Sequence, residues 1–255
     1  MDENKNKETG SFVGFILLNE PTIDLNLLKK DIENDWNILI DSKELNEKED
    51  SIVANIENLT VAISLVKAPI PNDEASENAK TNYSWQDAVK VAQDHKAHLI
   101  VAVLRGQNSL VDAATLYVKI CSSSLRQPNA TGINTSGCVY QPKAYIDLAK
   151  SYIENGDIPI LNLIYFGVYS NDNGKTISAY TYGLRIFGKY DIEIIDSNHT
   201  TEEVFNFLHN IIDYILESNV ELKDGETIGF TAEQKLPITL SSSDILGIET
   251  LKIRY

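Results

Sequence analysis

Two histidines three residues apart, His95 and His98, come nearest in type and spacing to a metal site. Imidazoles at this spacing on a helix share one face and can bind one zinc ion, which needs three or four ligands. An apolar run begins at Leu99, so we expect the helix to end before His98 and His98 to lie in a turn. Because no nearby Cys, Asp or Glu motif supplies a third ligand, both histidines are interpreted as structural, and no metal or other cofactor is predicted.

Two cysteines, Cys121 and Cys138, stand in unrelated contexts and form no CxxC or metal spacing. Cys138, in TSGCVY, has small neighbours and is considered as a reactive thiol, for which His199 or His209 would have to approach through folding. The commoner case is a buried, inert cysteine. Two free thiols, no export signal and no apolar run of membrane-spanning length predict a cytoplasmic protein without membrane partners.

Carboxylate pairs are the remaining candidates for acid and base chemistry. Glu202 and Glu203 are adjacent on an expected helix and point about 100° apart, so they serve the helix N-terminus, where negative charge is favoured. Asp191 and Glu193 share a strand face, and acidic and amide side chains crowd a hairpin at 172–173. The sequence has no GxSxG, HExxH or glycine-rich phosphate motif, and no catalytic residue is predicted.

Aromatic residues suggest a contact surface. Tyr165 and Tyr169 fall on one face of an expected strand, and Tyr180 and Tyr182 lie on its hairpin partner. We expect the second pair to line the core. Tyr165, Tyr169 and Arg185 are therefore the predicted binding residues, open to a partner.

The charge of the chain restricts the partners. Its 255 residues include 22 Lys and Arg against 37 Asp and Glu, a formal net charge of -15. Such a surface repels phosphate backbones and anionic lipids, which argues against nucleic-acid and membrane roles and favours encounter with a basic protein. At 43% hydrophobic residues the composition is that of a globular protein.

The first part of the chain predicts alternating strands and helices. Strands are expected at 11–18, 38–40, 59–66 and 99–104, with helices after Asp24 and Ser84. This β-α-β-β-α-β order is typical of ferredoxin-like folds, and residues 11–105 are predicted to form one lobe. A helix at 110–121, capped by Ser109, is interpreted as a connector to the second lobe.

Residues 106–255 are predicted to form the second lobe. Strands are expected at 160–169, 176–187 and 191–195, followed by a helix whose capping box is Thr200 with Glu203. The predicted fold class is α+β, with mainly antiparallel or mixed sheets packed with helices, arranged as two ferredoxin-like lobes or as one packed unit.

Several segments resemble an uncharacterised bacterial family known only as a domain of unknown function, of the four-two-six-one type. They are KAPIP at 67–71, HKAHLIVAV at 95–103, GCVYQP at 137–142, YTYGLRIFGKYDIEI at 180–194 and LKDGETIGF at 222–230. The resemblance brings no catalytic residue. Such families are often encoded near polymorphic toxin loci, which implies an immunity or other binding role.

The leading functional hypothesis is a non-enzymatic acidic binding protein, such as an immunity protein or effector-associated protein with a basic partner. The alternative is an enzyme or small-molecule binder with a dispersed site in a cleft between the lobes, using His98, Cys138 or Arg185. A third reading is an assembly subunit with a large apolar self-contact. The sequence does not indicate an oligomeric state.

Overall fold

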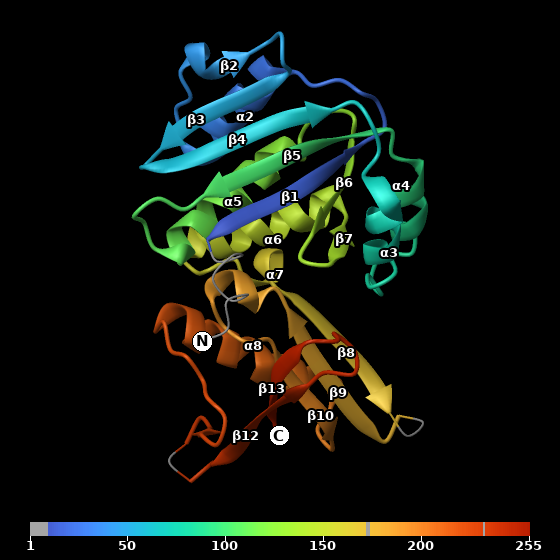
Figure 1. The fold of residues 1–255 in the computed structure, drawn as a ribbon, viewed down its shortest axis with the longest axis vertical. Coiled ribbons are helices and arrows are strands. Elements are labelled where there is room, and N and C mark those ends of the chain that lie inside the picture. The colour runs from blue at the N-terminus through green and yellow to red at the C-terminus, as the bar shows by residue number, and fades with distance from the viewer. Residues whose placement is uncertain (1–9, 172–173, 232) are drawn as a thin grey trace. The chain divides into compact units, whose positions relative to one another are not determined.

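The chain forms two compact units, Gly10–Leu163 and Ile164–Tyr255 (Figure 1). The structure is a computed structural model that describes residues 10–171, 174–231 and 233–255. Each unit contains one antiparallel or mixed sheet, on which several helices pack in the first unit and one in the described part of the second. The predicted α+β class is confirmed.

The first unit is built on a seven-stranded sheet in the order β2-β3-β4-β5-β1-β6-β7, and every neighbouring pair is antiparallel. Alternation of buried and less buried residues along β4 shows the two-residue period expected of a strand with one face in the core. The strands are β1 (Ser11–Leu18), β2 (Leu45–Asn46), β3 (Ser51–Ile56), β4 (Leu59–Val66), β5 (Ala97–Leu104), β6 (Ala130–Thr135) and β7 (Cys138–Tyr140).

The helices of the first unit are α2 (Leu25–Trp36), α3 (Glu74–Ala79), α4 (Ala88–Asp94), α5 (Leu110–Ser124), α6 (Pro142–Asn155) and α7 (Ile160–Leu163). The Ser109 hydroxyl accepts a hydrogen bond from the Asp112 amide at the start of α5, which confirms the predicted cap. The connector role of this helix is wrong. Its residues from Ala113 onward are largely buried, and it packs on β1 and β5, so it belongs to the core of the first unit.

Three expectations for the first unit need correction. Residues 38–40 form no strand: Leu39 is 75% exposed, and Ile40 is buried without pairing to the sheet. The sheet instead gains β3, which follows the charged segment at 41–50. Residues 106–163, expected in the second lobe, supply β6 and β7 to this same sheet, so a four-stranded ferredoxin-like lobe ending at 105 is not formed.

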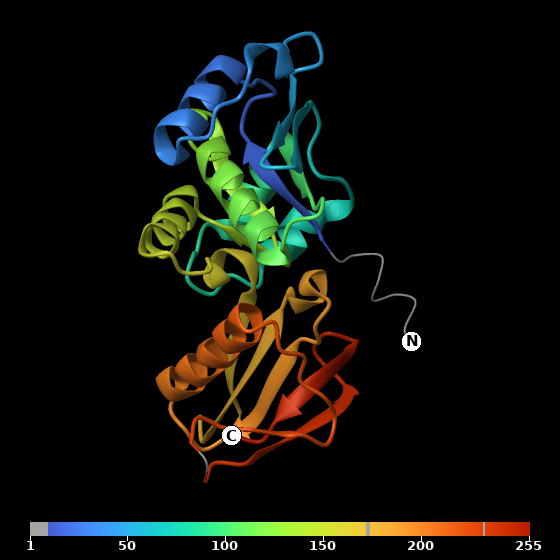
Figure 2. The ribbon, with the colours of Figure 1, turned by 90° about the vertical axis from the view of Figure 1, so that its left-hand side faces the viewer.

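The second unit has a six-stranded sheet in the order β11-β12-β13-β10-β9-β8, in which β10 and β13 are parallel. One helix, α8, runs along a single face of this sheet (Figure 2). This arrangement also differs from the expected ferredoxin-like lobe. The elements are β8 (Tyr165–Asn171), β9 (Thr176–Tyr182), β10 (Ile192–Ser197), α8 (Thr201–Glu217), β11 (Thr227–Ile228), β12 (Leu236–Ser242) and β13 (Glu249–Ile253).

Two strands of the second unit are shorter than expected. Residues 160–163 form helix α7, so β8 begins at Tyr165. Strand β9 ends at Tyr182 because Gly183 has a φ of 128°, a backbone conformation that an extended strand cannot continue. Residues 184–187 then form a 3₁₀ turn. The capping box of α8 is confirmed, since Thr200 and Glu203 bond each other's backbone amides.

In the described part of the chain, no helix has both the length and the apolarity that crossing a bilayer requires.

Candidate binding surface on the second unit

The side chains of Tyr165 and Tyr169 lie on the sheet face opposite α8. Successive side chains of a strand point to opposite faces, and Phe166, the residue after Tyr165, points toward α8. Its ring centroid lies 5.3 Å from that of Phe205 on this helix. The register pairs Tyr165 with Tyr182, so the tyrosines of β9 stand on the same face as those of β8. We call Tyr165, Tyr169, Tyr180 and Tyr182 the tyrosine face.

Only part of the tyrosine face is accessible. Tyr169 is 37% exposed and Tyr182 is 41% exposed, whereas Tyr165 is 8% exposed. The expectation that Tyr180 and Tyr182 line the core is wrong, because the cross-strand register turns both away from α8. A partner would therefore meet Tyr169 and Tyr182 first.

A glycine in β8 leaves room for one of the rings of the tyrosine face. A Cβ on Gly167 would lie 2.2 Å from Cε1 of Tyr180, so the Tyr180 ring covers the space that a side chain would fill. Its centroid lies 5.9 Å from that of Tyr165 and 6.4 Å from that of Tyr169. Both separations lie in the range of favourable contacts between aromatic rings.

Negative charge acts on the hydroxyl of Tyr169. Partial burial raises the pKa of this hydroxyl, a hydrogen bond with Ser178 opposes the rise, and the negative charges of Glu193, Asp196 and Asp244 add to it. Among the described residues, Asp196 and Asp244 are exposed and form no ion pair, whereas Glu193 has Lys252 Nζ at 3.9 Å. The accessible end of the tyrosine face is therefore negatively charged.

A β-bulge positions the Asp196 carboxylate. The β9–β10 register shifts between Ile194 and Ser197, and Asp196 has a φ of 53°. Its amide donates to Ser178 Oγ, and its Oδ1 accepts hydrogen bonds from Asn171 Nδ2 at 2.8 Å and Thr176 Oγ1 at 3.1 Å. The bulge thus brings a carboxylate from β10 to the end of β8.

Arg185, the third predicted binding residue, lies in the 3₁₀ turn after β9. Its Nη2 donates to the Glu249 carbonyl at 3.2 Å, and its Nε is buried without a hydrogen-bond partner in the described part of the chain. The Nη2 hydrogen bond ties the turn to β13. The binding roles of Tyr165, Tyr169 and Arg185 stay predictions.

The same turn is anchored by a buried carboxylate. Asp191 is 1% exposed, and its Oδ1 accepts hydrogen bonds from Thr181 Oγ1 and from the Leu184 amide, each at 3.1 Å. Burial raises the pKa of Asp191 to about 6, and the two hydrogen bonds and the Arg185 charge oppose that rise. Glu193 accepts from Thr250 Oγ1 at 2.9 Å, which leaves neither carboxylate open to a reacting group.

The two histidines of the first unit are structural, as expected. His95 accepts from the Ile70 amide at 2.8 Å through Nε2, and its Nδ1–H donates to the Ala92 carbonyl. The expected turn position of His98 is wrong, because this residue lies buried in β5. Its Nδ1–H donates to the Ala68 carbonyl at 2.9 Å, and burial is the main cause of its lowered pKa.

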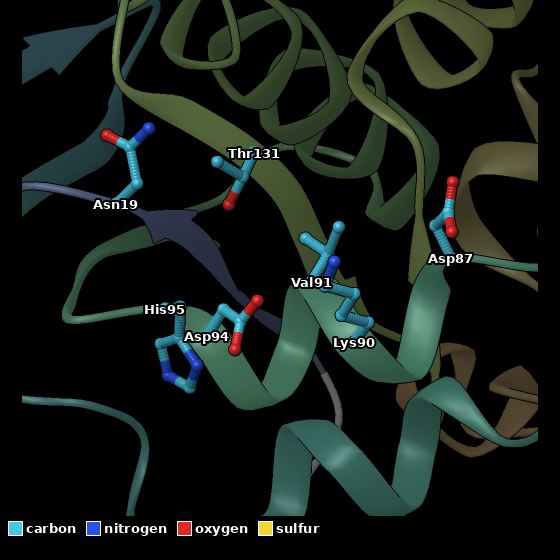
Figure 3. Close-up of a pocket in the computed structure, with 7 residues that line it drawn as sticks. All are labelled: Asn19, Asp87, Lys90, Val91, Asp94, His95 and Thr131. Carbon is cyan, nitrogen blue, oxygen red and sulfur yellow. The ribbon is translucent and has the colours of Figure 1, made fainter.

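A pocket of about 320 Å³ opens beside His95 (Figure 3). Its lining residues are Asn19, Asp87, Lys90, Val91, Asp94, His95 and Thr131. Both ring nitrogens of His95 are already used, so the imidazole offers no lone pair to a metal. Within the described ranges, no group of three His, Cys, Asp or Glu side chains is placed to hold a metal ion.

The thiol chemistry considered for Cys138 is unfavourable. Cys138 is 1% exposed, and burial raises its pKa. Burial likewise raises the pKa of Cys121. A raised pKa keeps a thiol protonated and unreactive. His199 and His209 lie in the second unit, where His199 stacks on Tyr255 with ring centroids 4.2 Å apart.

Two carboxylate candidates remain, the adjacent glutamates at the start of α8 and the hairpin pair at 172–173. Glu203 serves the capping box of α8, as predicted, and the Thr200 hydrogen bonds lower its pKa. The hairpin pair at 172–173 lies outside the described residues.

Fold and surface together define an acidic α+β protein whose second unit presents a tyrosine-bearing sheet face. Residues 180–254 match the family model described as "Domain of unknown function (DUF4261)". The predicted resemblance is confirmed for these residues, and for the segments before residue 180 it stays a prediction. No curated protein and no solved structure matches the chain.

Proposed function

We propose that this chain is a non-enzymatic binding protein that docks a basic partner protein on the tyrosine face. The observation that carries the proposal is Tyr169, which is 37% exposed and lies two residues from Asn171, whose Nδ2 is hydrogen-bonded to the exposed Asp196 carboxylate at 2.8 Å. An aromatic ring beside negative charge suits a lysine or arginine side chain, because the ring face attracts the cation and the carboxylates pair with it.

The charge of the second unit supports the same partner. Residues 164–255 contain 14 Asp and Glu against 7 Lys and Arg. An excess of one sign accelerates encounter with a protein of the other sign and repels proteins of the same sign. A basic toxin or effector neutralised in the cytoplasm fits this surface, and the two free, buried thiols suit a reducing compartment.

The test uses a defined probe, a short acetylated and amidated peptide that alternates arginine and threonine. We expect wild-type protein to bind it, and to bind it more weakly at about 0.15 M than at about 0.01 M salt, because salt screens the carboxylates. Tyr169→Ala is expected to weaken binding about fivefold, the equivalent of ~1 kcal/mol for one cation–π contact.

Matched controls separate the tyrosine face from general acidity. Tyr214 on α8 is 46% exposed, and Glu217 at the end of the same helix is exposed, so Tyr214→Ala and Glu217→Gln remove groups of the same kind from α8. Asp244→Asn should weaken binding and Glu217→Gln should weaken it much less. The proposal would be contradicted if Tyr169→Ala and Tyr214→Ala lost the same affinity for the peptide, or if Asp244→Asn and Glu217→Gln did. Equal binding of a peptide with glutamate in place of arginine would also contradict it.

A second measurement seeks the native partner. Capture from a lysate of the source organism at low salt is run with the wild type and both tyrosine variants. A partner that Tyr214→Ala retains and Tyr169→Ala loses supports docking on the tyrosine face.

A further inference from the structure

The sheet edges of this protein differ in length. An edge strand presents unpaired N–H and C=O groups, and proteins commonly make edges short to prevent unwanted pairing. The first sheet ends in β2 and β7, which have two and three residues, and the second sheet ends on one side in β11, which has two. Strand β8, at the other edge of the second sheet, has seven residues.

Strand β8 also lacks the usual protection of an edge. Its sequence, YFGVYSN, contains no charged residue and no proline, either of which would hinder addition of another strand. In the described structure β8 forms a ladder with β9 alone, and Figure 1 shows it at the rim of its sheet. Its outer half, residues 168–171, is partly or fully exposed.

A strand added to β8 would place half of its side chains beside the tyrosine face. Neighbouring strands lie about 4.8 Å apart, so these side chains would be next to Tyr169 and Asn171. The Asp196 carboxylate already reaches Asn171, with 2.8 Å between Oδ1 and Nδ2. A long basic side chain on the added strand could therefore lie on the Tyr169 ring and pair with Asp196.

Charge favours a foreign strand over a second copy of this chain. Each copy carries a net charge of -15, and its own β8 has no basic residue to offer to Asp196 and Asp244. Like charges brought together oppose association.

We infer that β8 is a strand-addition site, which binds an extended segment of the partner with basic side chains at alternate positions. The inference rests on the proposed function and specifies how the partner binds. Main-chain hydrogen bonds to β8 would supply affinity, and alternate basic side chains on the tyrosine face would supply specificity.

The experiment compares the arginine–threonine peptide with two N-methylated forms, one methylated at every arginine and the other at every threonine. In a β-strand, successive N–H groups point to opposite edges, so all arginine N–H groups point one way and all threonine N–H groups the other. Strand addition predicts that one form loses affinity about tenfold or more while the other binds like the parent peptide.

Hydrogen exchange supplies an independent readout on the full chain. Outward-facing amides among residues 168–171 should exchange more slowly when the parent peptide is bound, and amides of β2, β7 and β11 should not change. Equal binding by both methylated forms, with β8 exchange unchanged, overturns strand addition and leaves docking by side chains alone. No binding of the parent peptide overturns the proposed function as well, and concentration-dependent self-association through β8 would point to a second copy.

Discussion

Replacing Asp191 by asparagine tests how the second unit tolerates a buried charge. In the folded protein this carboxyl has a pKa of about 6, against 3.8 for an unperturbed aspartate, with burial as the main cause. Its Oδ2 is buried and has no hydrogen-bond partner in the described structure. Asp191→Asn keeps an oxygen for the Thr181 and Leu184 hydrogen bonds and removes the titrating proton.

The direction in which the stability difference between Asp191→Asn and the wild type changes with pH follows from proton linkage. The folded state binds the Asp191 proton more tightly than the unfolded state, so this group stabilises the fold fully below a pH of about 3.8 and loses that contribution as the pH rises through about 6. A shift of about two pKa units corresponds to ~3 kcal/mol. The free energy of unfolding of Asp191→Asn, minus that of the wild type, should therefore rise by ~2.4 kcal/mol between about pH 4 and about pH 7, which is most of this contribution.

The assay is urea unfolding at a series of pH values, followed by far-ultraviolet circular dichroism. Both tryptophans, Trp36 and Trp85, belong to the first unit, so their fluorescence reports that unit separately. The buried amide nitrogen of the variant has its own cost of about 1–3 kcal/mol, which does not depend on pH. The informative quantity is therefore how the difference in free energy of unfolding between Asp191→Asn and the wild type changes with pH.

Glu203→Gln provides a control of opposite sign. The Thr200 hydrogen bonds lower the pKa of Glu203, so this carboxylate stabilises the fold above its unfolded pKa and loses that contribution as the pH falls through its folded pKa. The stability of Glu203→Gln relative to the wild type should fall as the pH rises. If the Asp191→Asn difference stays flat or also falls with rising pH, the reasoning about Asp191 is refuted.

Three further outcomes are expected. Thr200→Ala removes the N-cap of α8 and should lower the free energy of unfolding by about 1 kcal/mol in urea titrations, with Thr200→Ser restoring most of the loss. Ile211→Ala, in the fully buried stripe of α8, should lower it by about 2–5 kcal/mol, and a loss under about 1 kcal/mol would show that the helix is not packed as described. The thiols of Cys121 and Cys138, whose pKa values burial raises, should react with an aromatic disulfide reagent at about pH 8 only after urea is added, and rapid reaction of the folded protein would contradict their burial.

Local patterns in the sequence predicted several elements correctly. The capping box of Thr200 with Glu203 identified the start of α8, and Ser109 identified the start of α5, because a helix cap depends on residues within one turn. The runs that form β1, β4 and β5 were recognised by their apolar, β-branched content. Net charge follows from composition alone and sets the class of partner proposed here.

Tertiary structure decided how the elements pair. Only the register of β8 with β9 shows that Tyr180 and Tyr182 share a face with Tyr169, and only the bulge brings Asp196 to Asn171. The order of strands also leaves β8 at an edge. Strand pairing joins residues distant in sequence, and a shift of one residue turns every side chain to the other face, so local patterns contain too little information to determine such a surface.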